Sequence, residues 1–148
     1  MKKIINNLTV AKILDAVAAL LILVAIIVTS VSNSVRGYNI SYFPFIIVLS
    51  IVSLLVIVLS IIFEEKIKYT YTIEAALLVC MVFSIICFAL VINSRTDLIG
   101  TLWITALDSV NPLAVKAMNT GTAGFVLYLV SALLILISSF FSFKKVAD

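Results

Sequence analysis

Asp15 is the residue of this chain best placed to do chemistry, because it is the only charged residue inside four long apolar stretches. An ionisable residue at membrane depth marks an ion or proton site by default. Lys12 lies three residues earlier, at the spacing of an ion pair on a helix. Ser60 and Ser138 are expected at a similar depth and could donate hydrogen bonds. Asp15 is therefore either a proton or cation site or a carboxylate paired near the membrane boundary.

A second group of polar and charged side chains lies in segment 94–121, between the third and fourth stretches. Asp97 and Asp108 are expected on one helix, about 16 Å apart along its axis, which is too far for paired carboxylate chemistry. This spacing disfavours an enzyme that acts on lipid at the outer surface. Trp103 is expected near the headgroups, where tryptophan is enriched. Asp97, Trp103 and Asp108 are therefore candidates for binding rather than catalysis.

Other reactive residue types are missing or badly spaced. The chain has no histidine, which removes the commonest acid–base group and metal ligand. Cys80 and Cys87 are seven residues apart, about 10 Å along a helix, which is too far for a disulfide. They also do not form the CxxC pair of a thiol oxidoreductase. We expect no enzymatic activity and neither a cofactor nor a metal.

Membrane-spanning helices are the elements that must position these residues. Hydrophobic residues make up 64% of the 148 residues and charged residues 11%, against about 45–50% and about 25% in soluble domains. Each apolar stretch has roughly the 20 residues that cross a hydrocarbon core, and none alternates as a barrel strand would. We predict an all-α membrane protein, a single domain whose four transmembrane helices cover about 10–32, 43–63, 73–93 and 122–142.

Small residues recur on one face of each predicted helix. Lipid provides no hydrophobic drive for helix association, so close approach through small residues must provide it. These faces predict a left-handed four-helix bundle. Glu74 is expected in the first turn of the third helix, off its small-residue face, as a helix-start residue. The four faces comprise Ala11, Asp15, Ala18, Ile22, Ala25 and Thr29; Ser50, Ser53 and Ser60; Ala76, Cys80, Ser84 and Cys87; and Gly124, Ser131 and Ser138.

The outer loop 94–121 is expected to contain two short amphipathic helices on the outer membrane surface. Asn111 and Pro112 can begin the second of them, and Gly121 can end it. A loop that covers the bundle and a loop that binds a partner are equally compatible with this pattern. The first helix is predicted from apolar residues at helical spacing, namely Leu98, Ile99, Leu102, Trp103, Ala106, Leu107 and Val110.

The basic residues predict the orientation. Seven of the ten lie in segments that would share one side of the membrane, so the positive-inside rule places both termini in the cytoplasm. Basic residues beside helices also anchor to anionic lipid, so the net charge of +3 does not imply nucleic acid as a partner. The composition fits a bacterial inner membrane. The seven are Lys2, Lys3, Lys12, Lys66, Lys68, Lys144 and Lys145, against Arg36, Arg95 and Lys116 on the other side.

The sequence favours a structural or accessory subunit among the possible functions. Such a subunit would pack an apolar face against a larger integral membrane protein or against copies of itself. The alternative is a small proton- or cation-coupled transporter or channel that uses Asp15. A transport route needs polar groups across the membrane, and the middle of these stretches offers only hydroxyls and thiols.

Overall fold

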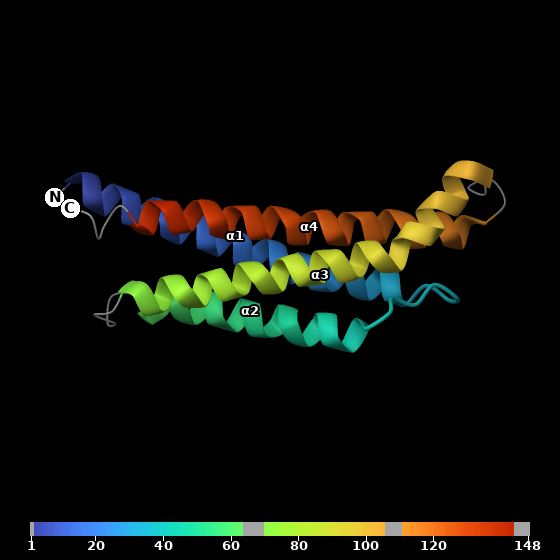
Figure 1. The fold of residues 1–148 in the computed structure, drawn as a ribbon, viewed down its shortest axis with the longest axis horizontal. Helices are drawn as coiled ribbons and strands as arrows, with labels where there is room; N and C mark the ends of the chain where they lie inside the picture. Colours follow the sequence, from blue (N-terminus) through green and yellow to red (C-terminus); the bar gives the residue numbers. More distant parts are fainter. Residues whose placement is uncertain (1, 64–69, 106–110, 144–148) are drawn as a thin grey trace.

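Four long α-helices run up and down in the computed structural model of the chain (Figure 1). The structure describes residues 2–63, 70–105 and 111–143, with side chains at 10–63, 72–101 and 111–141. Within these ranges the protein is all-helical, without strands, as predicted. The helices are α1 (Lys2–Asn33), α2 (Phe43–Phe63), α3 (Thr70–Thr105) and α4 (Pro112–Phe143).

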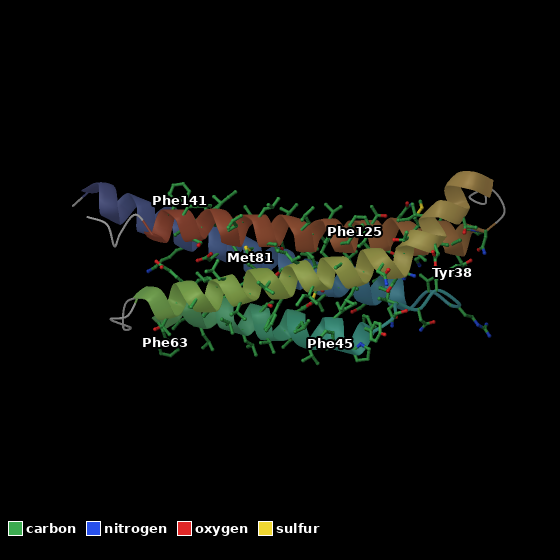
Figure 2. All side chains as sticks on the ribbon, in the orientation of Figure 1. Tyr38, Phe45, Phe63, Met81, Phe125 and Phe141 are labelled. Carbon is green, nitrogen blue, oxygen red and sulfur yellow. The ribbon has the colours of Figure 1, made fainter. Side chains whose placement is uncertain are left out.

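All four helices are long and apolar enough to cross a membrane, so the chain is a multi-pass membrane protein. The candidate spans have 21 to 30 residues, and about 20 are needed for a hydrocarbon core of about 30 Å. Phe45 and Phe63 are exposed at the two ends of α2 (Figure 2), where aromatic side chains commonly meet the membrane interface. The spans are Val10–Asn33, Phe43–Phe63, Thr72–Thr101 and Pro112–Phe141.

The segment between α3 and α4 differs from the prediction. Two separate short helices were expected within 94–121, but α3 continues to Thr105 and α4 begins at Pro112. Extending an existing helix avoids a new nucleation step, which is the unfavourable part of helix formation. Gly121 therefore lies inside α4 rather than at a helix end. Pro112 occupies the first position of its helix as predicted, and the Asn111 side chain accepts a hydrogen bond from the Ala114 N–H at 3.3 Å.

The helices pack unequally around the bundle axis. The most extensive helix–helix contacts are those of α4 with α1 and of α4 with α3. Helix α2 also packs against α1 and α3, but its contacts with them are less extensive. The first residues of α1 and the last residues of α4 lie at one end of the bundle (Figure 1), which we call the terminal end. The opposite end, where α1 turns into α2 and α3 approaches α4, is called the far end. Neighbouring helices are thus antiparallel.

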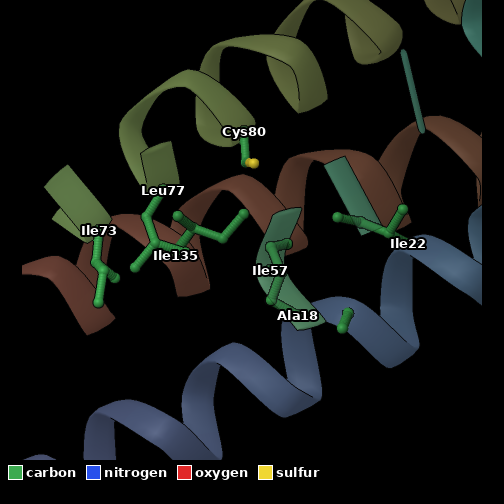
Figure 3. Close-up of a cluster of buried hydrophobic side chains, with 8 residues drawn as sticks. Ala18, Ile22, Ile57, Ile73, Leu77, Cys80 and Ile135 are labelled. Atoms are coloured by element: carbon green, nitrogen blue, oxygen red, sulfur yellow. The ribbon is translucent and has the colours of Figure 1, made fainter. Parts of the chain in front are cut away.

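The small-residue faces predicted from the sequence form the interior. All six predicted residues of α1 are buried, and so are the predicted residues of α4. On α2 and α3 the prediction fails only at Ser60 and Ala76, which are half-buried beside a surface groove. In the terminal half, apolar side chains from all four helices complete the packing, including Ala18, Ile57 and Ile135 (Figure 3).

Gly124 marks a close approach between α1 and α4. A β-carbon at Gly124 would lie 2.8 Å from Oγ1 of Thr29, which is itself fully buried. Real β-carbons essentially never come that close, so the two helices meet at this depth only because residue 124 is glycine.

We expect Gly124→Ala to lower the free energy of unfolding by about 1–3 kcal/mol, because the added methyl group overpacks a closed interface. Gly100→Ala is the matched control, since a β-carbon there meets nothing within 4 Å. It should be neutral or stabilising by about 0.5–1 kcal/mol. Unfolding in mild detergent, followed by circular dichroism against denaturant, measures both. Equal effects of the two substitutions would contradict the close approach.

Candidate functional sites at the two ends of the bundle

Two carboxylates are buried in the terminal half of the bundle. Asp15 is 7% exposed on the inward face of α1, as predicted, and half-buried Lys12 lies one turn earlier. Glu74 is only 2% exposed, so its prediction as a helix-start residue off the buried face was wrong. The reason is that α3 begins at Thr70, which places Glu74 beyond the first turn. Glu74 also shares the buried face of Leu77, at helical spacing.

A hydrogen bond between α4 and α1 lies in the same half of the bundle. The Ser138 hydroxyl, predicted at this depth, donates to the Ala11 carbonyl oxygen at 3.2 Å. Lys12, Asp15 and Glu74 each have an interaction partner. This end therefore combines two acids and one base, which suits either a fixed ion-pair network or a proton site.

A polar layer crosses the middle of the bundle. The hydroxyls of Ser50 and Tyr128 lie 2.7 Å apart, and Ser50 also donates to the Ile46 carbonyl oxygen at 2.7 Å. Cys87 Sγ lies 3.6 Å from the Ser50 hydroxyl. Tyr128 is fully buried. These hydrogen bonds connect α2, α3 and α4, and each donor has an acceptor inside the protein, as the hydrocarbon region requires.

The far end contains a buried arginine. Arg95 is 2% exposed, and its Nη2 donates to the carbonyl oxygen and the hydroxyl of Ser32, at 3.0 and 2.8 Å. The Ser32 hydroxyl in turn donates to the Ala117 carbonyl oxygen at 3.1 Å. The Arg95 side chain lies over Gly121, where a β-carbon would come within 2.9 Å of its Cγ and Nε. Arg95 on α3 thus links to α1 and α4 through one serine and one glycine.

A cavity of about 370 Å³ opens beside Arg95. Its walls come from α3, from the start of α4 and from the connection between α1 and α2, where Tyr38 lies (Figure 2). The Asn111 side chain donates to the Tyr38 hydroxyl at 2.9 Å and ties this connection to the start of α4. The lining residues are Gly37, Tyr38, Asn39, Ser94, Arg95, Asp97, Leu98, Thr101 and Ala114.

The structure separates the candidate residues of the sequence into two groups. Asp15 and Lys12 lie in the terminal half, whereas Asp97 is exposed on the cavity at the far end. Trp103 is part of α3, but its side chain is not among those described, and Asp108 lies outside the described residues. Within the described part of the chain, no group of three or more metal-ligating side chains comes together.

Sequence reasoning missed Arg95 as a buried residue. The signal was present, because Cys87, Val91 and Arg95 follow one another at four-residue steps on the buried face of α3. Ending the third helix at residue 93 placed Arg95 in a loop and hid this continuation.

The fold and its buried charges define a small all-helical multi-pass membrane protein with acids near one end of its bundle and an arginine near the other. Comparison of the chain with protein-family models, curated proteins and solved structures found no match.

The Ser50–Tyr128 hydrogen bond should be measurable by a double-mutant cycle with Ser50→Ala and Tyr128→Phe. We expect a coupling energy of about 0.6 kcal/mol and no more than about 1.7, the range for hydrogen bonds between membrane helices. Pairing Tyr128→Phe with Ser53→Ala is the control, because Ser53 donates to the Leu49 carbonyl oxygen instead. That second cycle should give no coupling, and equal coupling in both would contradict the contact.

Proposed function

We propose that this protein is a structural or accessory subunit that packs against a larger integral membrane protein or against another copy of itself. The observation that supports this is an apolar groove of about 370 Å³ between α1 and α2. The groove has no polar surface. It is lined by Ala16, Ala19, Leu20, Leu23, Leu54, Val58 and Ile61.

The groove has the character of a helix-binding surface. Because the side chains of Ala16 and Ala19 are small, the backbone of α1 is thinly covered where these residues line the groove. Small residues at such a position allow another membrane helix to approach closely. Leu20, Leu23 and Val58 form the rim and are exposed. A second groove, of about 190 Å³ and also mainly apolar, lies on the other side of α2. Both flank the helix that packs least on the rest of the bundle.

The bundle interior also favours a structural function. The Ser50, Ser53 and Ser131 hydroxyls each donate to a carbonyl oxygen four residues earlier in their own helix. Each of these hydroxyls has used its one donor within its own helix, so it has no proton left to donate to water or an anion and offers only acceptor lone pairs. The proposal includes a left-handed bundle, because the alternating three- and four-residue spacing of buried residues on α1 is typical of that geometry. It also includes the bacterial inner membrane, on the composition of the chain, and both termini in the cytoplasm, on the distribution of basic residues.

The mass of the protein in mild detergent tests this proposal. We expect an assembly larger than the 16.1 kDa chain, and a monodisperse monomer without a co-purifying protein would contradict it. Ala16→Phe should reduce the assembled fraction by filling the groove. Ala89→Phe is the matched control, because Ala89 is exposed on α3 and lines neither groove.

A second candidate function is proton- or cation-coupled transport, which is favoured by the burial of Asp15 and Glu74 in the same half of the bundle. Two carboxylates in a low-dielectric site can share or exchange a proton. Polar side chains also follow the interior toward the far end, including Ser84 and Tyr128.

Flux measured in proteoliposomes separates the two functions. On the transport hypothesis, Asp15→Asn abolishes a proton-coupled flux that the wild type shows, while Asp97→Asn leaves it intact because Asp97 is exposed at the other end. On the structural hypothesis, all three proteins behave alike. A flux that persists in Asp15→Asn would rule out Asp15 as the coupling site.

A further inference from the structure

We propose that the far-end cavity binds the headgroup of a zwitterionic phospholipid that carries a primary ammonium group, such as phosphatidylethanolamine. In this assignment Arg95 holds the phosphate and Asp97 holds the ammonium group. The site is independent of the grooves beside α2, since it lies at the far end and is built mainly from α3.

The charge of Arg95 is the first reason. Its side chain is 2% exposed, and within the described residues its interactions are hydrogen bonds to Ser32, with no carboxylate among its partners. Its hydrogen bonds within the described residues both leave from Nη2, and Nε is buried without a hydrogen-bond partner. A buried charge that lacks a counter-ion is strongly destabilising. An anion from outside the described chain would remove that penalty.

The position of Arg95 along α3 identifies the source of the anion. Arg95 lies 21 residues after Glu74 on the same buried face. At 1.5 Å per residue the two charges are about 31 Å apart, close to the thickness of a hydrocarbon core. With Glu74 near one boundary, Arg95 is at the depth of the lipid phosphates on the other side. A planar guanidinium can bind a phosphate through two parallel hydrogen bonds.

The second charged residue of the cavity, Asp97, favours one class of lipid headgroup over others. Asp97 lines the same cavity and is exposed, as expected for a carboxylate that receives a cation. Ser94 and Tyr38 add hydroxyl groups to the walls. A primary ammonium group can donate hydrogen bonds to Asp97, whereas the quaternary ammonium of phosphatidylcholine has no N–H. Phosphatidylglycerol has no cation at all, so the pair of charges favours phosphatidylethanolamine.

Lipid binding is measured on the full chain, delipidated in detergent, by the rise in melting temperature on titration with a short-chain phosphatidylethanolamine. A ligand that binds only the folded state stabilises it in proportion to its occupancy. We expect a saturable rise for phosphatidylethanolamine and a weaker one for the matched phosphatidylcholine and phosphatidylglycerol.

Three variants test the assigned contacts. Arg95→Gln should raise the Kd for phosphatidylethanolamine about tenfold or more, through the loss of charge-assisted hydrogen bonds. Arg36→Gln is the matched control, because Arg36 is exposed in the connection between α1 and α2, and it should bind as the wild type does. Asp97→Asn should remove the preference for phosphatidylethanolamine over phosphatidylglycerol while the phosphate is still bound.

Gly121→Ala is a variant that keeps the positive charge of Arg95 but changes the position of its side chain. Its β-carbon would displace the Arg95 side chain, which lies 2.9 Å away, so lipid binding should weaken although the arginine is retained. This variant keeps the proposal testable if Arg95→Gln does not fold.

Several outcomes would overturn the proposal. Equal lipid affinity in the wild type, Arg95→Gln and Gly121→Ala would remove Arg95 from the site. A rise in melting temperature with inorganic phosphate alone, matched to that with lipid, would assign the site to free phosphate. If Asp108→Asn lowers the melting temperature as far as Arg95→Gln does, and the wild type does not respond to lipid, the counter-ion of Arg95 is Asp108.

Discussion

Contact between helix backbones through small side chains is the interaction on which the rest of this bundle depends. In lipid, helices gain nothing by hiding apolar surface from one another, so association requires close packing and hydrogen bonds. The contact of Thr29 with Gly124 and the position of Arg95 over Gly121 show how α4 meets the other helices. Only after the backbones have approached this closely can Ser32, Ser50 and Tyr128 reach acceptors on neighbouring helices.

The interior could be predicted from the sequence because it follows from this one requirement. Small residues at three- and four-residue spacing can be recognised without any tertiary information, and the predicted face of α1 is buried throughout. The helix ends could not be predicted in the same way. Leu98 and its neighbours have the same periodicity whether they form a separate surface helix or continue α3, and only the tertiary structure distinguishes the two. The error at Arg95 follows from this, since it depends on where α3 ends. The error at Glu74 also comes from assigning Ala76 to the buried face, since Glu74 and Leu77 are buried and Ala76 is only half-buried.

The buried face of α3 carries two charged residues, which are separated by a long uncharged stretch. Glu74 lies near one end of its buried face and Arg95 near the other, with Leu77, Cys80 and Val91 between them. Burying a charge in the hydrocarbon centre is unfavourable, and the stretch of α3 between these two residues carries no charge. At 36 residues, α3 is about 54 Å long, which exceeds even the full bilayer of about 40–45 Å. The helix therefore has more residues than a single crossing of the bilayer needs.

The unequal packing of α2 has a consequence for assembly. Its span has the highest mean hydropathy of the four, 3.3 against 2.7, 3.0 and 2.4, so it is the helix most stable in lipid by itself. The span of α4 has the lowest value and the largest buried share, and α4 therefore depends most on its neighbours. During membrane insertion, α2 can therefore be stable in the bilayer as an independent helix, whereas α4, which is synthesised after α1, α2 and α3, completes the packing of these four helices when it docks. Substitutions between apolar residues should therefore be tolerated more readily on α2, where an apolar side chain of any shape can face lipid, than on the inward face of α4.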